Sequence, residues 1–189
     1  MIGSNEACIL SLFIILLVSI LVFIIIIYNR FISLNNNIKR DWANINVSLK
    51  QRSNELPNLI NIVKGYMKYE KTTLETITKA RSYLNQTEDV NKKAAASEII
   101  SESIKSLFAV VENYPDLKAQ ENFSHLQNRI TALENEIADR REYYNECVTI
   151  YNIRIKSFPD LIIAKIINAN EKRLFQATDE EKKEVKLKF

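Results

Sequence analysis

The residues from Ala7 to Asn29 form a stretch of 23 positions without a charged side chain, in which Ile, Leu, Val and Phe dominate. A helix rises ~1.5 Å per residue, so a helix over 7–29 is long enough to cross a hydrocarbon core of ~30 Å. A cleaved signal peptide is disfavoured, because Met1–Glu6 carries no Lys or Arg and the apolar run is too long. We therefore expect a single transmembrane helix over 7–29 that anchors the chain in a lipid bilayer.

Basic residues flank this stretch on one side only. Arg30, Lys39 and Arg40 follow it closely, whereas no Lys or Arg precedes it. Cytoplasmic flanks of membrane spans carry an excess of Lys and Arg. The pattern therefore favours a single-pass protein of the cell membrane with a cytoplasmic C-terminal domain.

The composition of the remaining chain excludes several classes of function. Without Glu6 it holds 26 basic and 22 acidic residues, mixed along the sequence rather than gathered into the basic face that binds nucleic acid. Gly3 and Gly65 are the only glycines of the whole sequence, so neither a phosphate-binding loop nor a dinucleotide-binding fingerprint can be built. We expect no cofactor and no nucleic-acid partner. Residues 169–189 are rich in both charges and are interpreted as a solvated, frayed tail.

Apolar residues recur at spacings of three and four over residues 30–168, which is typical of amphipathic helices packed on a core. Short connections between such helices favour antiparallel neighbours. We expect an all-α fold, in which the transmembrane helix is followed over 30–168 by an up-and-down antiparallel bundle of about four long helices. The seams of this bundle comprise Ile38, Trp42, Ile45, Leu49, Leu56, Leu59, Val63 and Tyr66, then Leu74, Ile77 and Leu84, then Ile100, Ile104, Leu107, Val111 and Tyr114, and last Phe123, Leu126, Ile130, Leu133, Ile137, Tyr144, Val148, Tyr151, Ile155 and Phe158.

Pro57 lies inside the first of these seams. A proline has no N–H to donate to the carbonyl four residues earlier, so it either opens a new helix capped by Ser53 or Asn54, or kinks a continuous one. The sequence leaves both interpretations open. Pro115 and Pro159 are expected to end the second and the last helical segments.

The usual signatures of catalysis are missing. Cys147 and His125 would lie roughly 33 Å apart on one helix, far beyond hydrogen-bond reach. A carboxylate-bridged metal site needs two Glu-x-x-His pairs, and the chain has one histidine. Glu134, Glu136 and Asp139 are interpreted as a solvated face rather than as metal ligands. We expect neither a metal site nor an enzyme.

Four charged residues lie on or near the apolar seams. Arg52 and Arg141 occupy positions whose neighbours are Leu, Ile and Tyr, and Glu70 and Glu112 are near seam positions of other segments. A buried Arg needs a partner, so we expect an Arg–Glu network between helices. Such a network either fixes the register of the helices or forms a site for an anion or a peptide carboxylate.

Two Tyr-Asn pairs, Tyr144-Asn145 and Tyr151-Asn152, lie seven residues apart and hence on one helix face, beside Tyr143. Buried tyrosines pack in cores when their hydroxyl groups reach polar partners. Tyrosine is also enriched at the energetic centres of protein interfaces. The pairs therefore indicate either core packing or a ridge that binds a partner.

Three blocks of sequence closely resemble the bacterial LemA family, together with the Tyr28-Asn29 pair that follows the apolar stretch. The blocks are Trp42–Glu70 (WANINVSLKQRSNELPNLINIVKGYMKYE), Leu107–Phe123 (LFAVVENYPDLKAQENF) and Glu134–Ala164 (ENEIADRREYYNECVTIYNIRIKSFPDLIIA). The resemblance implies a membrane-tethered antiparallel helical bundle without an established enzymatic activity. After Ala164 the family usually continues into a Gly-Phe and an aromatic-rich tail, from which this chain departs.

Family-pattern residues that map onto this chain include Pro57, Gly65, Tyr114, Pro115 and Pro159, which capping and kinking explain. The others, which are polar, are kept as candidates for a polar seam or an interaction site, and none is assigned a catalytic role. These candidates are Arg52, Asn58, Glu70, Arg81, Glu112, Arg141, Tyr144, Asn145, Tyr151 and Asn152.

Three hypotheses for the function follow. The first is a non-enzymatic interaction or scaffold protein that binds another membrane protein or a second copy of itself. The second is a protein that binds the membrane surface or anionic lipids through Arg30, Lys39, Arg40 and the amphipathic segment after Pro159. The third is an enzyme with an unrecognised site.

Overall fold

The computed structural model describes residues 4–67, 70–177 and 183. Within this part of the chain the regular structure is entirely helical, in the order α1 (Ser4–Lys64), α2 (Lys71–Gln86), α3 (Val90–Val111), α4 (Pro115–Lys118), α5 (Glu121–Arg154) and α6 (Asp160–Ile166). The all-α class is confirmed. Four of these helices are long, as expected, and the short α4 and α6 add to them.

The chain divides into two compact units. Unit 1 contains residues 1–39 and 147–172, and unit 2 contains residues 40–146 and 173–189. Both α1 and α5 contribute residues to each unit. The two units are described separately below.

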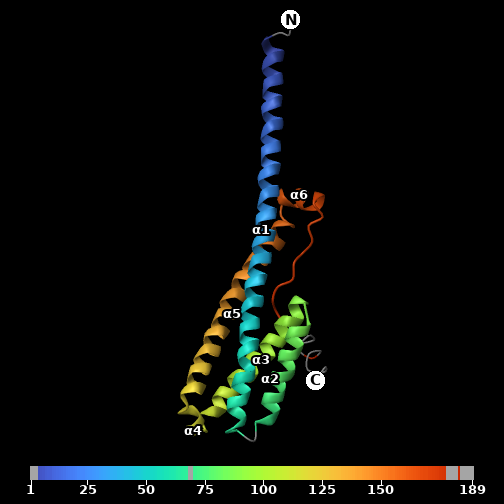
Figure 1. Ribbon diagram of the computed structural model, residues 1–189. Coiled ribbons are helices and arrows are strands. Elements are labelled where there is room, and N and C mark those ends of the chain that lie inside the picture. Colours follow the sequence, from blue (N-terminus) through green and yellow to red (C-terminus); the bar gives the residue numbers. More distant parts are fainter. Residues whose placement is uncertain (1–3, 68–69, 178–182, 184–189) are drawn as a thin grey trace. The chain divides into compact units, whose positions relative to one another are not determined.

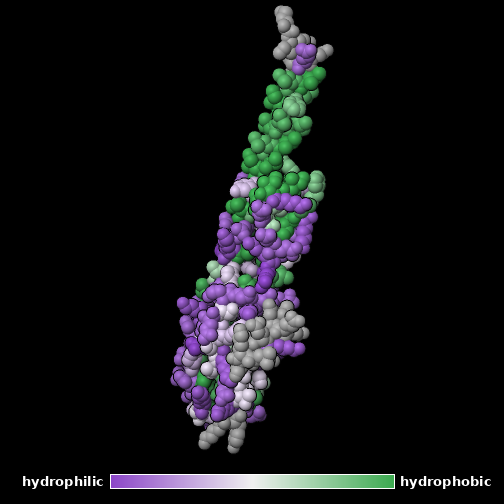
Figure 2. Space-filling model, turned by 90° about the vertical axis from the view of Figure 1, so that its right-hand side faces the viewer, coloured by the Kyte–Doolittle hydropathy of each residue, from purple (hydrophilic) through white to green (hydrophobic). Residues whose placement is uncertain are grey.

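Unit 1 carries the apolar stretch. From Ile9 onward, α1 is long and apolar enough to cross a membrane, and the side chains of its N-terminal part are exposed. Figure 2 shows a continuous apolar surface over this part of α1. Further along, Ile27 and Phe31 are buried, and the Phe31 ring packs edge-on against the Tyr151 ring of α5 with centroids 6.0 Å apart. One N-terminal helix of this kind is typical of a single-pass membrane anchor.

Unit 2 is the helical bundle. Its helices run up and down in chain order, from the C-terminal half of α1 through α2 and α3 to α5 (Figure 1). The N-terminus of α3 is capped by Asp89, whose carboxylate accepts hydrogen bonds from the main-chain N–H groups of Asn91 and Lys92 at 3.0 and 3.1 Å. Pro115 begins α4, where the missing N–H costs nothing.

The apolar seams form the cores of the two units. Most of the predicted core residues are buried, including Ile45, Leu59, Ile100 and Ile130 of unit 2 and Val148 of unit 1. Tyr66 and Phe158 are exposed instead, because each lies just beyond the end of its helix, where the 3.6-residue period no longer holds.

The structure shows how the chain passes Pro57 and where the last long helix ends. Pro57 does not break the first helix, since α1 continues through it to Lys64. The last long helix ends at Arg154, before Pro159. The tail was also predicted to fray from residue 169, but its described residues include the buried Phe175.

Candidate functional site

The side chain of Arg52 has no exposed surface and forms the centre of a polar network inside unit 2. Its Nη1 donates hydrogen bonds to Oε1 of Glu134 at 2.6 Å and to the Ser101 hydroxyl at 2.8 Å. Its Nη2 donates to the Ser97 hydroxyl at 2.7 Å. The Ser101 hydroxyl in turn lies 2.7 Å from Oε2 of Glu134, to which it can donate. The network therefore joins α1, α3 and α5.

The electrostatics of this network favour a structural role. Burial lowers the pKa of the Arg52 guanidinium, and the Glu134 carboxylate opposes that shift. A guanidinium stays protonated in proteins, so the buried charge is balanced by Glu134. Among its nitrogens only Nε has no partner in the structure. The arrangement fits the expected register-fixing pair better than an anion site, because the protein's own carboxylate already occupies the guanidinium.

The partner of Arg52 differs from the prediction. Glu70 and Glu112 were the glutamates considered for an Arg–Glu network, yet the carboxylate that binds Arg52 comes from Glu134, which was interpreted as part of a solvated face. Glu134 immediately follows the seam residue Leu133 on α5, and this position at the border of the seam lets its side chain reach inward while staying partly exposed.

Arg81 binds the main chain of α1, whereas Arg52 binds a carboxylate. Its Nε donates a 2.6 Å hydrogen bond to the main-chain carbonyl of Ser53. In an uninterrupted helix that carbonyl would accept from the N–H of residue 57, which Pro57 lacks. Arg81 of α2 thus satisfies the carbonyl that Pro57 leaves without its donor in α1.

The Tyr144-Asn145 pair holds the main chain of the C-terminal segment in unit 2. Oδ1 of Asn145 accepts from the Phe175 N–H at 2.7 Å, and its Nδ2 donates to the Phe175 carbonyl at 3.3 Å. The Tyr144 hydroxyl donates to the Arg173 carbonyl at 2.9 Å. The Trp42 ring packs beside both the Tyr144 and Phe175 rings, with centroids 5.8 and 5.9 Å away.

The Tyr151-Asn152 pair does the same in unit 1. Oδ1 of Asn152 accepts from the Lys172 N–H, and its Nδ2 donates to the Lys172 carbonyl, both at 2.9 Å. The Lys172 ammonium lies over the Tyr151 ring at 5.9 Å from its centroid. Each asparagine therefore binds both main-chain groups of one residue of the tail.

Four sequence candidates make none of the hydrogen bonds of these clusters, although Arg141 lines a small cavity with Glu134 and Phe175. Asn58 and Arg141 are exposed, and Glu112 forms a surface ion pair with Lys118. Glu70 is the N-cap residue of α2 but makes no side-chain capping bond. Arg141 was expected in the seam of α5. Its exposure agrees with the length of its side chain, which can carry the charge into water.

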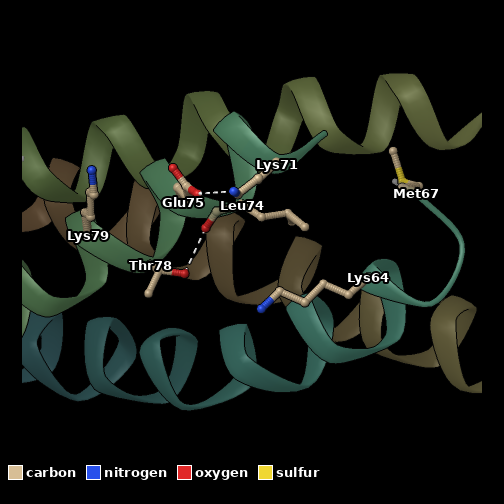
Figure 3. A pocket seen from close by; sticks show the side chains of 7 residues that line it. All are labelled: Lys64, Met67, Lys71, Leu74, Glu75, Thr78 and Lys79. Atoms are coloured by element: carbon tan, nitrogen blue, oxygen red, sulfur yellow. Dashed lines mark hydrogen bonds and ion pairs between the residues drawn. The ribbon is translucent and has the colours of Figure 1, made fainter. Parts of the chain in front are cut away.

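A separate cavity of about 510 Å³ lies at the start of α2 in unit 2. Figure 3 shows it lined by Lys64 from the end of α1, Met67 from the following turn, and a face of α2. Leu74 and Met67 are buried, whereas the Lys71–Glu75 pair, at 3.8 Å, is exposed. The α2 residues that line the cavity are Lys71, Leu74, Glu75, Thr78 and Lys79.

An apolar N-terminal helix followed by an antiparallel bundle, with a buried arginine joining three helices, defines the class of membrane-anchored helical-bundle proteins. The chain belongs to the LemA family, whose model matches residues 41–189. It is 29% identical to Protein LemA of Metamycoplasma hominis, over 79% of this chain and 69% of that protein. It is 22% identical to Magnetosome protein MamQ 2 of Paramagnetospirillum magneticum over 79% of this chain, and it spans 64% of that relative's length.

Proposed function

We propose that this protein is a non-enzymatic, membrane-anchored interaction protein, whose bundle binds another membrane protein or a second copy of the chain. Family membership and the apolar N-terminal helix support this proposal. Several polar candidates are used in contacts of the chain with itself, as the Arg52–Glu134 and Arg81–Ser53 bonds illustrate. A partner would therefore meet other residues.

The exposure of the Tyr143 side chain is the observation that carries the proposal. Its side chain is 64% exposed on α5 in unit 2, next to the buried Tyr144. An exposed tyrosine on a rigid helix is well suited to an interface, because its large amphipathic ring loses little conformational freedom on binding. The proposed interface is therefore the outer face of α5 around Tyr143.

Co-purification of two variants tests this interface. Tyr143→Lys should lose the proteins, or the differently tagged second copy, that purify with the wild-type chain from solubilised membranes. His125→Lys is the matched control, because His125 is also exposed on α5 in unit 2. Equal recovery of every associated protein with both variants would refute the proposal, provided that circular dichroism shows both to be folded.

A second candidate function is contact with the membrane surface. Three apolar side chains in and just before α6 are exposed: Phe158 by 81%, Ile162 by 52% and Ile166 by 71%. They belong to unit 1, which also contains the apolar stretch. Apolar side chains beside Lys165 are typical of a segment that inserts into the lipid headgroup region.

Hydrogen exchange in lipid nanodiscs tests the second candidate. The full chain should take up deuterium more slowly over residues 158–166 in discs of anionic phosphatidylglycerol than in discs of zwitterionic phosphatidylcholine. Added salt should reduce the difference, because it screens the attraction between lysine and anionic lipid. Equal uptake in both lipids at low salt would exclude this role.

A further inference from the structure

The C-terminal segment is bound in unit 2 through its main chain. Asn145 pairs with both the N–H and the carbonyl of Phe175, and Tyr144 donates to the carbonyl of Arg173. Residues 171–174 are outside any helix. Main-chain groups are the same at every residue except proline, so these three hydrogen bonds would hold any extended segment of suitable shape.

One side chain of the segment is recognised more closely. Phe175 is 2% exposed, and its ring lies against Trp42, which also contacts Tyr144. Phe175 borders a small cavity of about 110 Å³, whose lining includes the polar residues Ser97, Glu134 and Arg141. The site therefore favours an aromatic residue, since a smaller side chain in place of the buried Phe175 would lose the contact with Trp42 and leave a further void.

The site also favours a basic residue two positions before the aromatic residue. The Arg173 guanidinium lies 3.2 Å from the Asp89 carboxylate at the N-terminus of α3. Both side chains are partly exposed, so the ion pair contributes little affinity and mainly favours a basic residue at this position.

We propose that Trp42, Tyr144 and Asn145 form a peptide-binding site for an extended segment with a basic residue two positions before an aromatic residue. Residues 173–175 are its resident ligand, and a partner protein with such a segment displaces them. The inference extends the proposed interaction role by naming the chemistry of a partner. Its test uses purified protein and a defined peptide, so it succeeds or fails independently of Tyr143.

The resident segment is tethered to its site and competes at an effective concentration on the order of millimolar. Free peptide should therefore bind poorly until the resident ligand is weakened. Phe175→Ala removes the resident aromatic ring and leaves Trp42, Tyr144 and Asn145 in place. A matched pair of double variants then isolates the site: Phe175→Ala with Asn145→Ala, and Phe175→Ala with Asn128→Ala. Asn128 is an exposed asparagine on the same helix.

The probe is a fluorescein-labelled peptide of residues 170–177, NEKRLFQA, titrated with the full chain in detergent micelles. We expect Phe175→Ala to bind it at least tenfold more tightly than the wild type does. The Asn128 double variant should keep this affinity, and the Asn145 double variant should lose at least tenfold. A peptide with Ala in place of Phe should also bind at least tenfold more weakly. Equal affinity of Phe175→Ala and the wild type, or of the two double variants, would overturn the proposal.

A measurement on the wild-type chain does not depend on the folding of any variant. Excess unlabelled peptide should speed deuterium uptake over residues 171–177, because it displaces the resident segment from its hydrogen bonds. Unchanged uptake at saturating peptide would overturn the proposal by itself.

Discussion

Arg81 donates a 2.6 Å hydrogen bond from Nε to the main-chain carbonyl of Ser53, the acceptor that Pro57 leaves without a helical donor. This contact explains how α1 can continue through Pro57 to Lys64. It also ties α2 to α1 through a main-chain carbonyl inside α1.

A double-mutant cycle tests this relationship. Arg81→Met should lower the free energy of unfolding by about 1.5–3 kcal/mol, the usual worth of a hydrogen bond to a charged group. In a Pro57→Ala background the same change should cost clearly less, because the new N–H can satisfy the Ser53 carbonyl. Thermal unfolding in detergent, followed by circular dichroism, measures both. Equal costs in the two backgrounds would show that Arg81 does not act through this carbonyl.

The Arg52–Glu134 pair should be essential to the bundle. Removal of the carboxylate by Glu134→Ala should cost about 3–5 kcal/mol, because it leaves a buried guanidinium without its counter-charge. The double variant Arg52→Met, Glu134→Leu should be much closer to the wild type in stability, since no buried charge remains. Glu136→Ala is a suitable control, as Glu136 pairs only with Arg140 on the surface among the described contacts. A loss at Glu134 no larger than at Glu136 would contradict the structural role.

Alkaline pH tests the Tyr144 hydrogen bond. Burial raises the pKa of the Tyr144 phenol. Because the folded-state pKa is the higher one, the stability that this group contributes is complete below the unfolded value of about 10 and is lost as pH rises through the folded-state pKa. The melting temperature of the wild type should therefore fall more steeply above about pH 10 than that of Tyr144→Phe.

Other titrating groups are common to both proteins in that comparison. Burial also raises the pKa of Tyr151, for example, but Tyr151 is present in each. Parallel curves for the wild type and Tyr144→Phe would indicate that the phenol of Tyr144 does not contribute in its protonated form.

Limited proteolysis tests the asparagine contact in unit 1. Asn152→Asp replaces the amide that donates to the Lys172 carbonyl with a carboxylate, which cannot donate at neutral pH. We expect trypsin to cleave after Lys172 several times faster in this variant than in the wild type. Asn128→Asp introduces the same charge elsewhere on α5 and should leave the rate unchanged. Unchanged cleavage in Asn152→Asp would mean that this asparagine does not hold the segment.

Periodicity predicted the fold well because burial follows the helical period closely. The spacing of Leu56, Leu59 and Val63 identifies the inner face of α1, and all three are buried. Whether α1 would continue through Pro57 could not be predicted, because the contact that satisfies the Ser53 carbonyl comes from Arg81, which lies 24 positions further along the chain. A tertiary hydrogen bond of this kind has no local signature.

The candidate site was predicted in part. The buried Arg52 follows from its seam position, but Glu134 was missed because residues bordering a seam can turn either inward or outward. The two Tyr-Asn pairs were recognised as candidates, but the C-terminal segment whose main chain they bind was not predicted. Phe175 lies in a charged segment whose composition indicates fraying, and only the repeated Tyr-Asn spacing could have suggested a bound chain.

Photo-crosslinking in living cells tests the central claim, that the bundle is an interaction protein, most directly. A photoreactive phenylalanine derivative would replace Tyr143 in one strain and His125 in another, and the adducts would be identified by mass spectrometry. The account predicts a defined protein adduct, either another membrane protein or a second copy of the chain, at position 143 and not at 125. The absence of any protein adduct at 143, or the same adducts at both positions, would contradict it.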